Sequence, residues 1–213
     1  NFDAILEQGQ KQALAVVTKK YALVQTREVF RQVLEACPDD IEGRVAYYGG
    51  KAVMVLFPAG FRAGATVVNS VDRSTALQMR FVWREDDLHI YLPQHVAGVR
   101  RVHVGRVREV FGRLATTLAE AHSKWASIVQ DLSTKEAGEE DLQAIAKASG
   151  KKAAKQLEEW YRERCAEGAA RPSIWSLILR AMTIVASRRY KSEVTREERL
   201  RRLSVALLGY ALG

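Results

Sequence analysis

The sequence predicts an α+β fold: an antiparallel sheet of β-hairpins covered by a long helix, followed by a C-terminal helical region. Three observations lead to this fold class. Apolar and polar residues alternate in segments between residues 44 and 92, a period of two that is typical of strands. The pair Gly49-Gly50 separates two such runs, as in a hairpin turn. From about Val99 onward, apolar residues recur instead at helical spacing.

The hairpin at Arg44–Phe57 comes first. With the two glycines as its turn, Tyr48 lies opposite Lys51. Successive side chains of a strand point to opposite faces, so we expect one face to be core and the other to be exposed to water. The predicted core face carries Val45, Tyr47, Ala52, Met54 and Leu56, and the predicted exposed face carries Arg44, Tyr48 and Lys51.

Further strands follow at Val67-Val68, at Thr75–Trp83 and at Leu88–Leu92, the last two on either side of the polar turn Arg84–Asp87. Their apolar face carries Leu77, Met79, Phe81, Trp83, Leu88 and Ile90, whereas Gln78, Arg80, His89 and Tyr91 point the other way. A sheet with one apolar face needs a covering layer. We expect the helix over residues 99–128 to supply it.

Helices are predicted around this sheet by apolar spacing and by capping residues. The N-terminal segment 2–17 has loose helical spacing, and Thr26 begins a helix that Pro38 ends. Later helices are expected to begin near Ser133, Lys151, Ser173 and Thr195. Among them, Trp175 is expected to be a buried anchor. We expect two parts, an α+β core over residues 1–128 and a helical region over residues 129–213.

The composition excludes several classes of protein. The 213 residues include no apolar run long enough to span a bilayer and no secretory signal pattern. Cys37 and Cys165 fit a reducing cytoplasm without disulfides. Phosphate-loop, dinucleotide and zinc motifs are absent. We therefore expect a cytoplasmic protein without cofactor or metal, and the sequence favours a protein without catalytic activity. The first residue, Asn1, indicates a fragment of a longer chain.

The positive charge is concentrated in two segments. Of the net charge of +8, residues 96–125 contribute +4 and residues 171–213 contribute +6, offset by the acidic stretch between them. Concentrated positive charge attracts polyanions, and single-strand binders add aromatic platforms on which bases stack. The candidate nucleic-acid-binding residues are Arg100, Arg101, His103, Arg106 and Arg108 at the head of the long helix, and Arg44, Tyr48, Lys51, Arg80 and Tyr91 on the exposed sheet face.

Several segments, in the same order, resemble a phage/plasmid-like protein family of uncharacterised function. They are Tyr21–Phe30, Val45–Leu56, Val68–Leu77, Arg101–His103, Ile174–Thr183 and Leu208-Gly209. The chain departs from the family pattern at Arg180, where the family has asparagine, and at Arg73, where it has glycine. The resemblance implies a mobile genetic element as the setting. The predicted topology is also similar to that of RecT/Redβ-type single-strand annealing proteins.

These observations favour a nucleic-acid-binding protein, with single-stranded DNA as the preferred partner, that acts in recombination or replication and forms a homo-oligomer. The alternative is a protein-interaction or oligomerising factor of a phage or plasmid that acts on a host partner without binding nucleic acid. A third hypothesis is an enzyme acting on nucleic acid, which would need clustered carboxylates around a metal. The basic helices could also be ordinary solvated surfaces.

Overall fold

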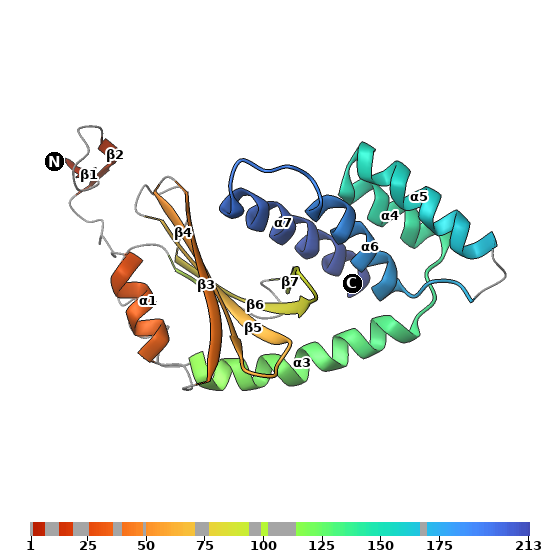
Figure 1. Ribbon diagram of the computed structural model, residues 1–213, viewed down its shortest axis with the longest axis horizontal. Coiled ribbons are helices and arrows are strands. Elements are labelled where there is room, and N and C mark those ends of the chain that lie inside the picture. The colour runs from red at the N-terminus through yellow and green to blue at the C-terminus, as the bar shows by residue number, and fades with distance from the viewer. Residues whose placement is uncertain are drawn as a thin grey trace.

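The computed structural model describes residues 2–6, 13–18, 26–35, 40–48, 50–70, 77–93, 99–101, 114–166 and 170–213. Figure 1 shows a twisted sheet with a helix against each face and a layer of helices beside it. This arrangement confirms the predicted α+β class.

The main sheet is antiparallel throughout. Its order is β3-β4-β5-β6-β7, with bounds Ile41–Tyr48, Lys51–Pro58, Ala63–Ser70, Leu77–Glu85 and Leu88–Tyr91. A short strand, β8 (Val99–Arg101), pairs with β6 through Leu77–Met79, whereas β7 pairs with β6 from Val82 onward. Because β5 occupies the opposite edge of β6 along both stretches, β7 and β8 follow one another along a single edge.

The register of the first hairpin is confirmed, since Tyr48 lies opposite Lys51. The strand predicted at Val67-Val68 is longer than expected, because β5 extends over all of Ala63–Ser70. Gly64 in β5 is required by close packing: a Cβ at this position would lie 2.2 Å from the carbonyl oxygen of Leu56. Only glycine allows the two backbones to approach in this way.

One face of the sheet packs against α1 (Thr26–Glu35), as Figure 1 shows on the left. Its buried side chains surround Val29, Phe30 and Val33 of the helix. They include five predicted for the core face, Ala52, Met54, Leu56, Leu77 and Met79, together with Ala65 and Val67 of β5. At the outer strand β3, however, Val45 and Tyr47 of the predicted core face remain exposed.

The sequence predicts that the opposite face is exposed to water, and this prediction is wrong. In the structure α7 (Glu193–Ala211) covers this face. Val194 of α7 is buried in one cluster with side chains of four strands: Val53, Val55, Phe57, Val68, Val82 and Tyr91. A strand buried on both faces reads as a continuous apolar run. The sequence of β4, Lys51–Pro58, is such a run.

The predicted helix over residues 99–128 is wrong at its beginning, because Val99–Arg101 form strand β8. The helix that the structure describes, α3, spans Leu114–Thr134. It packs against the sheet as predicted for Phe81, Trp83, Leu88 and Ile90, which share a core with Trp125. The rings of Trp83 and Trp125 lie 6.0 Å apart. Leu77 and Met79 pack under α1 instead.

The remaining helices form a layer that shares this core. They are α4 (Glu139–Ser149), α5 (Lys151–Ala166) and α6 (Ile174–Ala186). Trp175 of α6 is buried, which confirms its predicted role as an anchor. The predicted division at residue 128 falls inside α3. None of the described helices is both long and apolar enough to cross a membrane.

Two predicted helix starts and one predicted helix were wrong. Ser133 lies in the last turn of α3, and α4 begins after Gly138, whose N–H donates to the Asp141 carboxylate at 2.8 Å. The last helix begins before Thr195, because Ser192 is its N-cap. Residues 2–17 hold β1 (Phe2–Leu6) and β2 (Ala13–Thr18), which pair as a separate hairpin. The β-branched run Val16–Thr18 favours a strand.

Candidate functional site

The structure brings four of the predicted sheet residues under or beside α7. Tyr91 and Arg80 are buried and Lys51 is half-buried. Arg44 is exposed, at the edge of the surface that α7 covers. The exposed face that was to carry base-stacking aromatics is therefore absent at Tyr91.

The remaining candidates lie elsewhere. Tyr48 lies at the end of β3, with its backbone alone described. Arg100 and Arg101 lie in strand β8, so the helix N-terminus to which they were assigned is not at this position. His103, Arg106 and Arg108 lie outside the described residues. The structure does not bring the arginine segment and the sheet candidates together as one described surface.

What the structure does assemble under α7 is a buried carboxylate, Glu197, whose side chain is 3% exposed. Its carboxylate accepts hydrogen bonds from His89 Nδ1 at 3.1 Å and from the Tyr91 hydroxyl. The guanidinium groups of Arg44 and Arg196 lie 3.2 and 3.5 Å from the same carboxylate oxygen. We call these five side chains the Glu197 network. They join two strands of the sheet, β3 and β7, to the first turns of α7.

The network changes the protonation of its members. Burial would by itself raise the pKa of Glu197, but the hydrogen bond and charge of His89, with Tyr91 and Arg44, outweigh it, so the pKa lies below the ordinary value. Burial, with the neighbouring Glu197 carboxylate, holds the pKa of Tyr91 well above its ordinary value. Both shifts keep Glu197 as the anion and Tyr91 as the neutral donor.

A prediction about acid stability follows from the lowered pKa. Because the folded state binds this proton less readily than the unfolded chain, Glu197 stabilises the fold above the ordinary pKa of 4.5. That stabilisation is lost as the pH falls below this value. We expect the difference in unfolding free energy between the parent and Glu197→Gln, measured in urea, to narrow as the pH falls below about 4.5. A difference that widens in acid would contradict this assignment.

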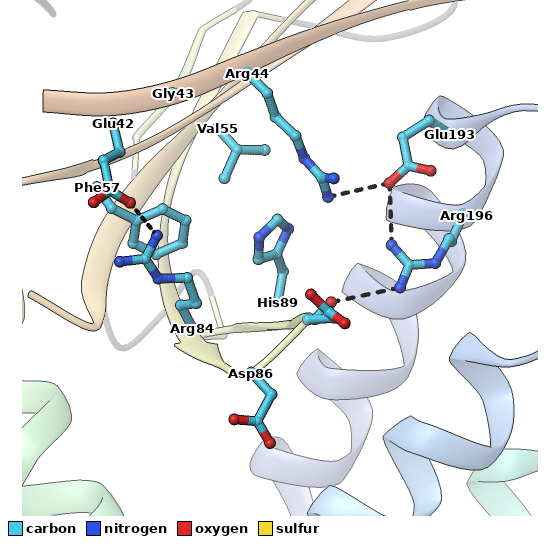
Figure 2. Close-up of a pocket in the computed structure, with 11 residues that line it drawn as sticks. Glu42, Gly43, Arg44, Val55, Phe57, Arg84, Asp86, His89, Glu193 and Arg196 are labelled. Carbon is cyan, nitrogen blue, oxygen red and sulfur yellow. Dashed lines mark hydrogen bonds and ion pairs between the residues drawn. The ribbon is translucent and has the colours of Figure 1, made fainter.

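Beside the network lies an open pocket of about 500 Å³. Figure 2 shows His89 at its floor, between the sheet and α7, with arginines around it. The pocket is lined by Glu42, Gly43, Arg44, Val55, Phe57, Arg84, Asp86, Asp87, His89, Glu193 and Arg196.

The cations of this pocket already have anionic partners. Arg84 pairs with Glu42 at 2.5 Å and lies over the Phe57 ring, and Arg44 and Arg196 share Glu193 at 3.1 and 3.0 Å. Carboxylates thus outnumber arginines among the lining residues, which makes the pocket a poor phosphate site.

The pocket also lacks a complete catalytic set. Because the Glu197 carboxylate only accepts hydrogen bonds, the Nδ1 of His89 is the donor, and the ring is oriented as a general base would be. However, the lining residues include no serine, threonine or cysteine that such a base could activate. No group of three or more His, Cys, Asp or Glu that could hold a metal is found in the described ranges. We interpret the Glu197 network as a structural clamp between α7 and the sheet.

Comparison with family models, curated proteins and solved structures finds no match.

The surface with the clearest chemical character lies at one end of the helical layer. There the α4–α5 junction and the α6–α7 connection lie on the same side, the upper side in Figure 1, and Arg199 of α7 lies beside Gly150 at the junction. We call this surface the basic end; its cations are Lys147, Lys151, Lys152, Arg188, Arg189, Lys191 and Arg199. All are exposed except Arg199, which is half-buried. Among the described residues, none of them is in an ion pair.

The sequence predicts concentrated positive charge over residues 171–213, but Glu197 was not among the predicted site residues. A signal for it exists, because Val194, Glu197 and Ser204 fall on the buried stripe of α7 with Leu200 and Leu208. A carboxylate at an apolar position of a helix needs buried partners. The partners His89 and Tyr91 lie on β7, more than a hundred residues earlier.

Proposed function

We propose that this protein binds nucleic acid, with single-stranded DNA preferred, and that the basic end is the contact surface. The observation that carries the proposal is the lack of carboxylate partners for the cations there, within the residues that the structure describes. The resemblance to the phage/plasmid-like family supports a mobile genetic element as the setting. Recombination or replication is the process proposed for it.

The distinction between paired and unpaired cations matters for binding. A cation that already touches a carboxylate gains less from a phosphate, because the first partner must be displaced or repels the second anion. Several exposed cations elsewhere on the described surface are paired in this way. Arg31 lies 2.8 Å from Glu28, Arg62 lies 2.7 Å from Glu85, and Lys135 lies 2.6 Å from Asp131. The basic end differs from these sites in its free positive charge.

The arrangement on helices suits a polyanion. Lys147, Lys151 and Lys152 flank the break between α4 and α5, and Arg188, Arg189 and Lys191 flank the break between α6 and α7. Cations on two neighbouring connections can contact successive phosphates of one strand, and this contact is independent of base sequence. Arg100 and Arg101 remain predicted contributors from strand β8.

The test is the salt dependence of oligonucleotide binding. Each neutralised phosphate contributes about −0.9 to the slope of log affinity against log salt for duplex DNA and about −0.7 for a single strand. The triple variant Arg188→Gln, Arg189→Gln and Lys191→Gln should therefore flatten the slope by about 2–3 units. Fluorescence anisotropy with single-stranded DNA, duplex DNA and RNA, each across a salt series, measures the slope and ranks the strand types.

The matched control is the triple variant Arg31→Gln, Arg62→Gln and Lys135→Gln. It removes the same charge from exposed positions whose cations have carboxylate partners. We expect it to leave the slope close to that of the parent. Equal flattening in both variants would show an effect of net charge alone, and no salt-dependent binding by the parent would favour the protein-interaction alternative.

A further inference from the structure

Among the residues that the structure describes, one edge of the main sheet is open. Strand β3 is the first in the sheet order, and it pairs only with β4 among the strands that the structure describes. The strand is eight residues long, Ile41–Tyr48, and most of its side chains are exposed. An open edge of this length presents unpaired backbone N–H and C=O groups, which are a template for another strand.

Exposed apolar side chains gather at the same edge. Leu34, Val45 and Tyr47 are 49%, 42% and 64% exposed, and they are three of the five exposed large hydrophobic residues among the described ones. The Tyr47 ring lies 6.4 Å from that of Phe30 in α1, and Leu34 follows Phe30 by one turn of this helix. Such a gathering beside an open edge is typical of an interaction surface.

The other face of β3 carries two residues of opposite charge. Glu42 and Arg44 lie on the α7 face, one residue to either side of Gly43, and both side chains are more than half exposed. Each also has an ion-pair partner within its own chain, Arg84 for Glu42 and Glu193 and Glu197 for Arg44, so the charges of a second strand would extend existing ion pairs. Ile41 and Val45 lie on the α1 face, two residues to either side of Gly43. On the α7 face, the segment around Gly43 therefore has an acidic residue on one side of the glycine and a basic residue on the other. On the α1 face it has an apolar residue on each side.

We infer that β3 pairs with β3 of a second copy of this chain, antiparallel, with Gly43 opposite Gly43 of the second copy. In this register Glu42 lies opposite Arg44 of the second copy, and Arg44 opposite its Glu42. On the other face, Ile41 lies opposite Val45 of the second copy. Opposite charges and apolar pairs directly across two strands both stabilise a sheet. The two sheets then form one continuous sheet through a two-fold axis.

Competing registers are less favourable. A two-fold axis normal to the sheet keeps each face on its own side, so a residue of β3, and not a gap between residues, must lie opposite its own copy. Centring the pair on Glu42 or on Arg44 would set like charges directly opposite each other, which is destabilising. Centring it on Val45 would leave neither charge opposite its counterpart. The charge pattern thus selects Gly43.

Light scattering after size-exclusion chromatography tests the assembly. We expect the full chain to have twice its monomer mass of 23.9 kDa. The variant Val45→Lys puts a charge in place of the apolar partner of Ile41 on the edge strand. It should shift the chain to the monomer, raising the dissociation constant at least tenfold. The control Tyr210→Lys changes a residue of similar exposure, 44%, at the far end of α7 and should leave the dimer intact. A monomeric parent, or dissociation by both variants, would overturn the proposal.

Disulfide trapping tests the register. With Cys37 and Cys165 replaced by serine, the variant Ile41→Cys with Val45→Cys places a cysteine pair across the interface twice. Directly opposed antiparallel residues have Cα atoms about 4.5–5.5 Å apart, within the range for a disulfide. We expect a covalent dimer on mild oxidation. Val45→Cys alone lacks its partner and should stay uncrosslinked. If it crosslinks as well as the double variant, or if the double variant gives ladders of higher mass, the Gly43 register is wrong.

Discussion

We expect the substitution Glu197→Ala to lower the free energy of unfolding by about 3–5 kcal/mol, because it leaves buried partners without their carboxylate. His89 Nδ1 and the Tyr91 hydroxyl both donate to this group, and Tyr91 is fully enclosed. Arg44 and Arg196 lose a shared anion at the same time. Urea unfolding followed by circular dichroism at neutral pH measures the loss.

The next residue provides the control. Glu198 pairs with Lys51 at 2.9 Å, but its side chain is 31% exposed, and water can replace the lost contact. Glu198→Ala should therefore cost only about 0–1 kcal/mol. If both variants lose the same free energy of unfolding, apolar packing holds α7 against the sheet and the buried carboxylate does not.

A comparable loss is expected for Trp125→Ala, again about 3–5 kcal/mol. The Trp125 side chain is fully buried, and its ring lies against Trp83 of β6. It belongs to the core that sheet strands share with α4, α5, α6 and α7. We therefore expect the sheet and the helical layer to unfold in one transition, with tryptophan fluorescence and helical circular dichroism coinciding.

Ser127→Ala, an exposed position on the same helix, should change stability by less than about 0.5 kcal/mol. Should the helical signal of Trp125→Ala persist after the fluorescence transition, the helical region from residue 129 would be an independently folding part. Coincident transitions would instead place the sheet and all the helices in one cooperative unit.

Much of the sheet was predictable because alternation carries both strand identity and face. The pairing of Tyr48 with Lys51 followed from two glycines, and the burial of Phe81 and Trp83 from period two. The second covering helix was not predictable in the same way. The apolar side chains of Val53, Val55 and Phe57 predict that this face of β4 is buried. The local sequence does not indicate which element buries it, and in the structure that element is α7. Contacts over such a sequence separation leave no periodic trace.

The errors near Arg100 and in residues 2–17 have a common physical cause. Strand β8 is three residues long, too short to show any period, and it continues into a segment whose valines and arginines also fit a helix. In the N-terminal hairpin, the spacing of Ile5, Leu6, Ala13, Leu14 and Val17 is compatible with a helix, whereas pairing between β1 and β2 decides for strands. Tertiary pairing overrides weak local preference in short segments.

Because α7 follows the sheet strands in the sequence, its position sets the order in which these elements can assemble on the ribosome. Strands β3 to β7 and helix α1 emerge first and can form their hairpins at once, since these contacts are local. The face bearing Val53, Val55 and Phe57 stays apolar and uncovered until residues 193–211 have been made. During that interval the nascent chain exposes an apolar sheet face, which is the kind of surface that chaperones bind. Chains that stop short of Glu193 would keep it exposed permanently and should accumulate as aggregates.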